Sequence, residues 1–188
     1  MTPTLVTAPA ELPVTIGEAK AQLRVDHFDD DALISGLIAS AVDHLDGYRG
    51  VLGRAIITQT WRVGARRWHP VMPLPFPDVQ SAIITYRDHE GAEQTVPPAE
   101  YDMIAVPLGA RIYFKDAFLS PQLHDDEAEP ITITFTAGYG GAADAPQDIK
   151  TAITLMVQMD YDQPEPQKSA AIQQAILAKI EKHRWTRV

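Results

Sequence analysis

The chain has 188 residues, of which 45% are hydrophobic, carries a net charge of −9, and contains no cysteine. This length can bury one core, and the lack of cysteine excludes disulfides, thiolate metal sites and cysteine nucleophiles. No apolar run reaches the roughly 18 to 20 residues of a membrane span, and the start of the chain lacks the features of a signal peptide. We therefore expect a protein made in the cytoplasm, with no membrane contact.

The charge is unevenly distributed along the chain. Residues 1–166 carry 11 Lys and Arg against 24 Asp and Glu, whereas residues 167–188 carry 5 against 1. Duplex binding depends on clustered cations, so the acidic body disfavours a protein that grips nucleic acid. The basic tail leaves three alternatives open: contact with phosphate, contact with an acidic protein surface, or simple solvation.

Two helices are predicted at the start. Thr15 and Glu18 form a capping box, which predicts a short helix at about 15–24. Three aspartates at 29–31 then favour the beginning of a second helix, because carboxylates suit the positive end of the helix dipole. Apolar residues at helical spacing continue this long N-terminal helix over about 30–49, where we expect Gly50 and Gly53 to end it.

From residue 57 the apolar period changes to two, which predicts an antiparallel sheet over about 57–137. A proline-rich stretch at 69–77 predicts an extended loop, since proline cannot donate to a sheet ladder. A second loop, at 121–130, is acidic and is expected to be exposed. The predicted strands, besides one that begins near 57, are 81–87, 93–96, 101–104, 111–114 and 131–137.

Two further helices follow the sheet. Asp144 and Pro146 predict the start of a helix at about 146–162, and prolines 164 and 166 are expected to stop it. The fold class is therefore α+β, a helical body with a small antiparallel sheet inserted in its middle. We expect a body at 1–166 and a separate C-terminal helix and basic tail at 167–188. The last helix, at about 168–184, carries an apolar stripe: Ile172, Ala175, Ile176, Lys179, Ile180 and His183.

Catalytic chemistry finds little support. The Asp26–Asp31 cluster with His27 could be read as metal ligands, but helix capping already accounts for its carboxylates. The glycines at 138–141 lack the Lys-Ser/Thr of a phosphate-binding loop, and Asp144 would repel phosphate, so a turn is favoured. No serine lies in a nucleophile-elbow pattern. We expect no enzyme activity, no cofactor and no metal.

One cluster in the body mixes basic and aromatic residues. It could bind nucleic acid or anchor a protein interface, and Trp and Arg are the commonest hot-spot residues of protein interfaces. A protein partner is therefore the better interpretation. The cluster consists of Trp61, Arg62, Arg66, Arg67 and Trp68.

The order of several segments resembles that in the head-tail connector (adaptor) family of long-tailed phages and prophages. Gene transfer agents carry similar adaptors. The likeness covers most of the chain, and each segment by itself is degenerate. The segments that carry it are Val14–Asp26, Asp29–Ile34, Arg54–Trp61, the Pro-Leu-Pro run at 73–75 before 79–81, Ile131–Gly140, and Pro146 at a helix start.

The resemblance implies a ring of subunits, by analogy twelve, that docks on the portal protein of a virion or phage-like particle. Such a ring extends the DNA channel, carries DNA only as passing cargo, and presents a platform to the next neck protein. The Trp61 to Trp68 cluster would then meet a neighbouring subunit or that neck protein. The C-terminal stripe would find its burial on the portal. The portal-binding residues would be Ile172, Ile176, Lys179, Ile180, Lys182, Arg184, Trp185 and Arg187.

Other interpretations stay open at this point. A stopper or tail-completion protein would share the sheet, although the opening helix pair argues against it. A small metal-dependent enzyme would use the Asp26–Asp31 cluster. A regulator that binds DNA through the basic tail would show steep salt dependence. The residues also do not separate a phage particle from a gene transfer agent.

Overall fold

A computed structural model describes residues 2–106 and 109–185, and it has the α+β fold expected, with four α-helices and antiparallel sheets within those residues. The described chain divides into two compact units. The sheet unit contains 2–8 and Thr58–Gly138, and the helical unit contains Pro9–Ile57 and 139–185. The predicted boundary at 166/167 does not coincide with this division, because the last helix packs within the helical unit.

The helical unit begins with α1 (Ile16–Leu23), whose start was predicted correctly. The Thr15 hydroxyl accepts a hydrogen bond from the Glu18 amide at 3.2 Å, and the Glu18 carboxylate accepts one from the Thr15 amide at 2.7 Å. These two bonds form the capping box and satisfy amides that a helix leaves unpaired at its first turn. The hydrogen bonds to Thr15 also hold the pKa of Glu18 below its ordinary value.

Helix α2 (Asp31–Leu45) is shorter than the predicted 30–49. It ends because Asp46 adopts an extended conformation and its carboxylate accepts a hydrogen bond from the Ile56 amide at 2.6 Å. Asp30 stands at the N-cap without a side-chain cap, so the expected capping role of the aspartates is wrong at that position. With 15 residues, α2 is also no longer than the C-terminal helices.

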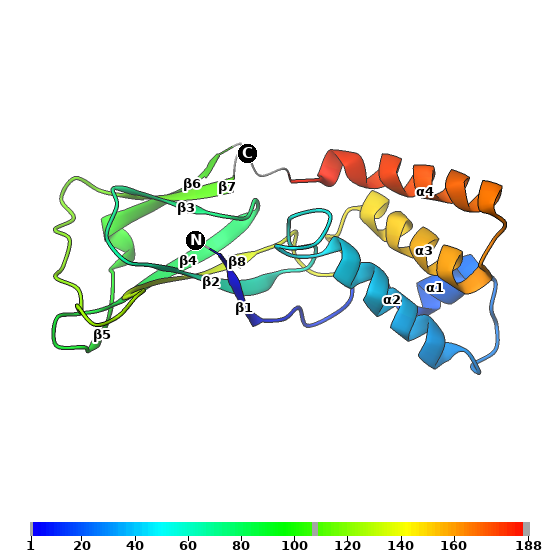
Figure 1. Cartoon of the computed structure of the whole chain (residues 1–188), viewed down its shortest axis with the longest axis horizontal. Helices are drawn as coiled ribbons and strands as arrows, with labels where there is room; N and C mark the ends of the chain where they lie inside the picture. Colours follow the sequence, from blue (N-terminus) through cyan, green and yellow to red (C-terminus); the bar gives the residue numbers. More distant parts are fainter. Residues whose placement is uncertain (1, 107–108, 186–188) are drawn as a thin grey trace. The chain divides into compact units, whose positions relative to one another are not determined.

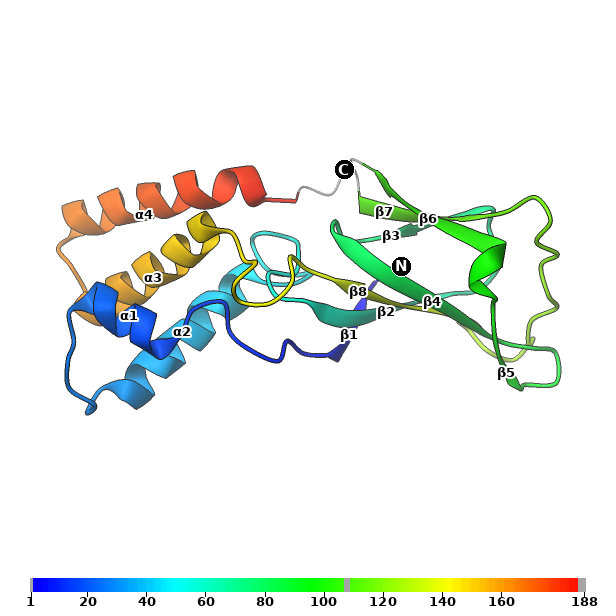
Figure 2. The same ribbon diagram turned by 180° about the vertical axis from the view of Figure 1, so that it is seen from behind.

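Helices α3 (Gln147–Asp162) and α4 (Pro166–Ile180) lie side by side in both views (Figures 1 and 2), and the 3-10 turn η2 (Glu181–His183) follows them. Asp144 does not cap α3; its carboxylate accepts from the Gly141 amide at 2.9 Å and closes the preceding turn. Helix α3 ends at Asp162, before the two prolines, as predicted. Pro166 begins α4 slightly before the predicted start at about 168, because a proline at the first helical position loses no intrahelical hydrogen bond.

All four helices contribute to the core of the helical unit. Ile34 and Ile38 of α2 and Ile149 and Ile153 of α3 are at most 1% exposed. Their i, i+4 spacing places each pair on one helix face, which is the face turned inward. The remaining buried members from the helices are Ala19, Ala41, Val42, Leu45, Ala152, Val157, Ile176 and Ile180.

The sheet unit contains a five-stranded antiparallel sheet in the order β1-β2-β8-β4-β5. Residues of β8 alternate between buried isoleucine or phenylalanine and half-buried threonine, so one face points inward and the other outward. The N-terminal strand β1 was not predicted, because its four residues are all exposed and carry no burial pattern. The strands are β1 (Thr4–Thr7), β2 (Gln59–Ala65), β4 (Val79–Arg87), β5 (Glu93–Thr95) and β8 (Ile131–Ala137).

A second sheet of three strands has the order β3-β7-β6, so the single sheet predicted over 57–137 is in fact two. Its strands are β3 (Val71–Leu74), β6 (Tyr101–Val106) and β7 (Gly109–Phe114), and the 3-10 turn η1 (Pro98–Glu100) leads into β6. Strand β3 lies inside the stretch predicted as a proline-rich loop. Pro73 is tolerated because β3 is an edge strand, paired only with β7.

The two sheets face each other and enclose an apolar core (Figures 1 and 2). The Trp61 ring lies 4.8 Å from Phe76, and Phe76 lies 5.9 Å from Phe135, measured between ring centroids. The acidic loop at 121–130 is mostly exposed, as predicted, and Leu123 forms an isolated bridge with Asp88. No described helix is long and apolar enough to cross a membrane.

Candidate docking surfaces

The cluster predicted to anchor a protein interface is divided by the sheet. Trp61 is only 8% exposed and belongs to the core, so its expected role as an interface anchor is wrong. Arg62 follows it on β2 and points to the opposite, outward face, because successive strand residues alternate. Arg66 and Arg67, just beyond β2, are exposed as well. The arginines, and not Trp61, are what this cluster offers to a partner.

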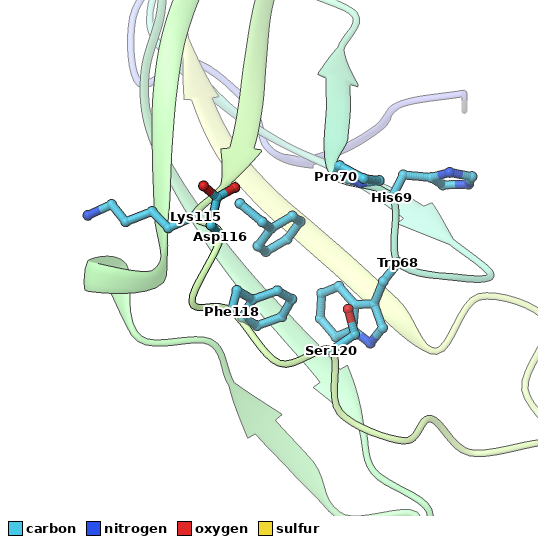
Figure 3. A pocket seen from close by; sticks show the side chains of 8 residues that line it. Trp68, His69, Pro70, Lys115, Asp116, Phe118 and Ser120 are labelled. Carbon is cyan, nitrogen blue, oxygen red and sulfur yellow. The ribbon is translucent and has the colours of Figure 1, made fainter.

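Trp68 belongs to an aromatic pocket of about 230 Å³ in the sheet unit. Its ring centroid lies 5.4 Å from Phe114 and 5.2 Å from Phe118, and its indole N–H donates to the Pro121 carbonyl at 3.0 Å. Figure 3 shows Trp68 and Phe118 coming from two separate connections to the same pocket. The lining residues are Trp68, His69, Pro70, Phe114, Lys115, Asp116, Phe118 and Ser120.

The apolar stripe of the C-terminal helix is already buried within its own unit. Ile176 is 8% exposed and Ile180 is 2% exposed, and both belong to the helical core, against which Ile172 also packs. The expectation that this stripe needs another protein to cover it is therefore wrong. Helix α3 covers it, because α3 and α4 present matching apolar faces to each other.

Part of the positive charge of the tail is neutralised by α3. Asp148, in the first turn of α3, accepts hydrogen bonds from Lys182 and from Lys179, the latter at 2.9 Å. These bonds lower the pKa of Asp148 from 3.8 to about 2. The ion pairs join the beginning of α3 to the end of α4, so Lys179 and Lys182 are not free cations waiting for a partner.

The chain beyond α4 is also tied to the helical unit. The Trp185 amide donates to the Leu52 carbonyl at 2.7 Å, and Arg54 donates to the His183 carbonyl at 3.2 Å. A side chain at Gly53 would lie 2.7 Å from the Trp185 carbonyl oxygen, so glycine permits this close approach. Burial lowers the pKa of His183. Arg184 is exposed, and the predicted contact residue Arg187 lies outside the described residues.

An open apolar groove of about 320 Å³ lies among α2, α3 and α4. Leu177 is 56% exposed at its edge, and Met156 and Met159 are half-buried. This groove was not predicted, since Leu177 falls beside the stripe of α4 and not on it. Long flexible Met side chains adapt to varied apolar partners. The lining residues are His44, Leu45, Val51, Met156, Met159, Gln173, Ile176, Leu177 and Ile180.

The Asp26–Asp31 cluster is used to hold the helices together. Asp31 pairs with Lys20 of α1 at 2.7 Å, and Asp30 accepts a hydrogen bond from Tyr161 of α3 at 2.5 Å. This hydrogen bond raises the pKa of Tyr161. Within residues 2–106 and 109–185, no group of three or more His, Asp or Glu side chains is placed to hold a metal ion. The cluster thus has a structural explanation in the packing of α1, α2 and α3.

Comparison with known proteins finds solved structures that resemble the whole of this chain. No family model matches the chain, and no curated protein matches it. A chain of the neck of an empty gene transfer agent particle, computed with C6 symmetry, has a TM-score of 0.78 and 24% identity. A chain of the virion of a native gene transfer agent particle has a TM-score of 0.76 and 25% identity.

A chain of the neck of a native gene transfer agent particle, computed with C12 symmetry, has a TM-score of 0.75 and 24% identity. Each of the three matches covers 100% of this chain and 97% of the other. Both units, including the sheet unit inserted into the helical one, are therefore shared with these neighbours. The likeness establishes that this chain has the fold of a protein found in the neck of a phage-like particle.

Proposed function

We propose that this chain is a non-enzymatic adaptor subunit of the neck of a phage-like particle. It forms a ring on the portal, extends the DNA channel, and offers a platform to the next neck protein. The observation that carries the proposal is the likeness to gene transfer agent neck chains over the whole of this chain. The order of the sequence segments, from the capping box at Thr15 to Pro146, supports the same family.

The ring is proposed to contain twelve copies, because a similar chain occurs in a neck computed with C12 symmetry. A net charge of −9 on each copy suits a channel through which DNA must slide. Carboxylates repel phosphates, and few fixed cations would hold the DNA in place. DNA is therefore cargo for this ring and not a ligand.

The helical unit is proposed to dock on the portal through the exposed side of α4 and the apolar groove beside it. Ile176 and Ile180 line this groove, but they are only 8% and 2% exposed, so they offer little surface of their own. Leu177 is the exposed apolar residue at the groove, and Arg184 is exposed near it along the chain. An apolar portal segment in the groove, with a carboxylate close to Arg184, would match both features.

The experiment is to mix the purified chain with purified portal rings and look for added density on the narrow end of the portal. Leu177→Asp should weaken binding at least about tenfold, because a charge would enter the apolar contact. The matched control is Leu33→Asp: Leu33 of α2 is 55% exposed, against 56% for Leu177, and lies outside the groove lining. Equal binding by both variants would contradict docking at the groove.

The same experiment separates an adaptor from a stopper or tail-completion protein. An adaptor binds a bare portal, whereas a component further along the neck binds only after another protein has been added. The opening pair of helices, α1 and α2, favours the adaptor, because the resemblance that begins at Val14 is to adaptors. Density on a portal that already carries another neck protein, and none on the bare portal, would favour the stopper.

A further inference from the structure

The sheet unit carries charges of opposite sign on two of its sides. The arginine side consists of Arg62, Arg66 and Arg67, which are exposed and make no ion pair among the described residues. The carboxylate side consists of Glu93 on β5, Glu100 in η1 and Asp102 on β6. Lys115 lies 3.9 Å from Asp102 and offsets part of the carboxylate charge.

The order of the strands places these two sides opposite each other. In the five-stranded sheet, β1 and β2 stand at one end and β5 at the other. In the three-stranded sheet, β3 and β6 are the two edges, and the Tyr101 hydroxyl of β6 donates to the Ala82 carbonyl of β4 at 2.9 Å. Strand β6 therefore lies on the β4 and β5 side. Phe76, just after β3, packs on Trp61 of β2, which places β3 on the arginine side.

An open strand edge lies on each of these sides. Strand β6 pairs only with β7, contains no proline, and exposes 47% of Ile104. Strand β1 pairs only with β2 and exposes 43% of Leu5. Of the two remaining edges, β3 is blunted by Pro73, which lacks an N–H, and β5 has only 3 residues. A row of backbone groups on an open edge is a template on which another extended strand can pair.

We propose that the carboxylate side of one copy pairs with the arginine side of the next copy, with the β6 edge laid along the β1 edge. Asp102 lies on β6, and Arg62 lies on β2 opposite Thr4 of β1. The two residues therefore bring opposite charges to that contact. Ile104 and Leu5 bring apolar area to it. The two surfaces differ, so the contact is head-to-tail and propagates around a ring instead of ending at a dimer.

A second copy is the favoured occupant because this chain itself supplies both surfaces. Like charges would oppose most other contacts between copies of a chain with a net charge of −9. The three arginines give the approaching carboxylate side an attractive target, since no carboxylate of the described chain is paired with them. This interface rests on the proposed function, in that it supplies the contact by which a neck ring would close.

The test exploits the absence of cysteine from the chain. Leu5→Cys and Ile104→Cys are introduced together, and particles from producing cells are treated with a short flexible dithiol-reactive linker. The double variant should give a ladder of covalent oligomers. Each single variant should give no cross-link, because a head-to-tail contact never brings two identical edges together. A mixture of the two single variants should stop at dimers.

The matched control combines Leu33→Cys on α2 with Ile104→Cys, since Leu33 is similarly exposed but lies outside the sheet unit. A ladder from this pair, or dimers from either single variant, would overturn the proposal. Charge reversal gives a second measurement. Arg66→Glu with Arg67→Glu should reduce the ladder about tenfold or more, and adding Glu93→Lys with Asp102→Lys should restore it. Arg49→Glu, an exposed arginine of the helical unit, should leave it unchanged.

Failure of the interface and failure of the proposed function give different results. If the chain is present in particles but the double-cysteine variant forms no ladder, the edge pairing is wrong and the neck role stands. If the chain is absent from particles, the neck role is wrong. The purified double variant at high concentration then decides the interface: a ladder keeps the edge pairing, and no ladder overturns it.

Discussion

The two units of the chain differ in how they use their charged and apolar side chains. In the helical unit the prominent apolar and charged side chains contact other residues of the same unit: Ile180 is buried, Lys20 pairs with Asp31, and Lys179 pairs with Asp148. In the sheet unit Arg62 is exposed without an ion pair among the described residues, and Ile83 is 56% exposed on the outward face. Apart from the apolar groove beside Leu177, the helical unit pairs its own groups, whereas the sheet unit leaves several groups without a partner of their own.

This difference changes where association should be sought. A helical stripe with a basic end suggests a docking segment when it is read alone, but the periodicity only says that one face is buried. It does not say which element buries it. In the sheet unit the features that indicate a partner are open strand edges and cations without an ion pair. Three pairs of substitutions test this contrast, beginning with the largest expected effect.

Ile180→Asp should destabilise the helical unit by more than about 4 kcal/mol, because it places a charge in a core position that is 2% exposed. Urea unfolding followed by circular dichroism measures the loss, and far-UV spectra should show loss of helix. Ile83→Asp is the counterpart in the sheet unit. It should cost no more than about 1 kcal/mol, because the side chain already meets solvent. Similar losses for both variants would remove the contrast between the units.

The helices could be predicted well because their signals are local. The capping box at Thr15 and the end of α3 at Asp162 lie where the sequence placed them. The end of α2 was missed because it depends on a contact ten residues away, between the Asp46 carboxylate and the Ile56 amide. Strand pairing is non-local in the same way. Nothing within Thr4–Thr7 shows that this exposed segment will pair with β2.

The candidate site could be predicted only in part. A likeness to proteins of the head-tail neck was available from the order of the segments, and Arg62, Arg66 and Arg67 are exposed. To predict that Trp61 is a buried member of the basic and aromatic cluster, one must know which face of β2 meets the second sheet. The groove beside Leu177 required knowing that α4 folds back on α3. Both depend on packing between elements that are distant in sequence.

Trp61→Ala should cost about 3 kcal/mol or more, because it leaves a cavity between the sheets beside Phe76. Arg62→Ala, one residue along the same strand, should change the free energy of unfolding by less than about 0.5 kcal/mol. The Arg62 variant should nevertheless weaken assembly into particles although it folds normally. The Trp61 variant should reduce assembly only because less of the chain is folded. Thermal unfolding and incorporation into particles, measured for both variants, separate the two roles. An Arg62 variant that unfolds as readily as the Trp61 variant would show that Arg62 supports the fold.

Asp148→Asn should have a smaller effect than Ile180→Asp or Trp61→Ala, and that effect should depend on pH. The pKa of Asp148 is about 2 in the folded chain and 3.8 ordinarily, so the folded state favours the ionised carboxylate. Its contribution to stability is fully present above about pH 4 and disappears as the pH falls toward 2. The difference in the free energy of unfolding between the natural chain and the variant should therefore shrink over this window.

Urea unfolding at several pH values between 2 and 7 measures that difference, with Asp160→Asn as the matched control. Asp160 lies on the same helix, is exposed, and makes no ion pair among the described residues, so its variant should show no comparable pH-dependent difference. A constant difference between the Asp148 variant and the natural chain across the window would mean that Lys179 and Lys182 are not held by Asp148 in solution. The cations of the tail would then be available to the portal after all, and the helical unit would resemble the sheet unit in leaving charge for a partner.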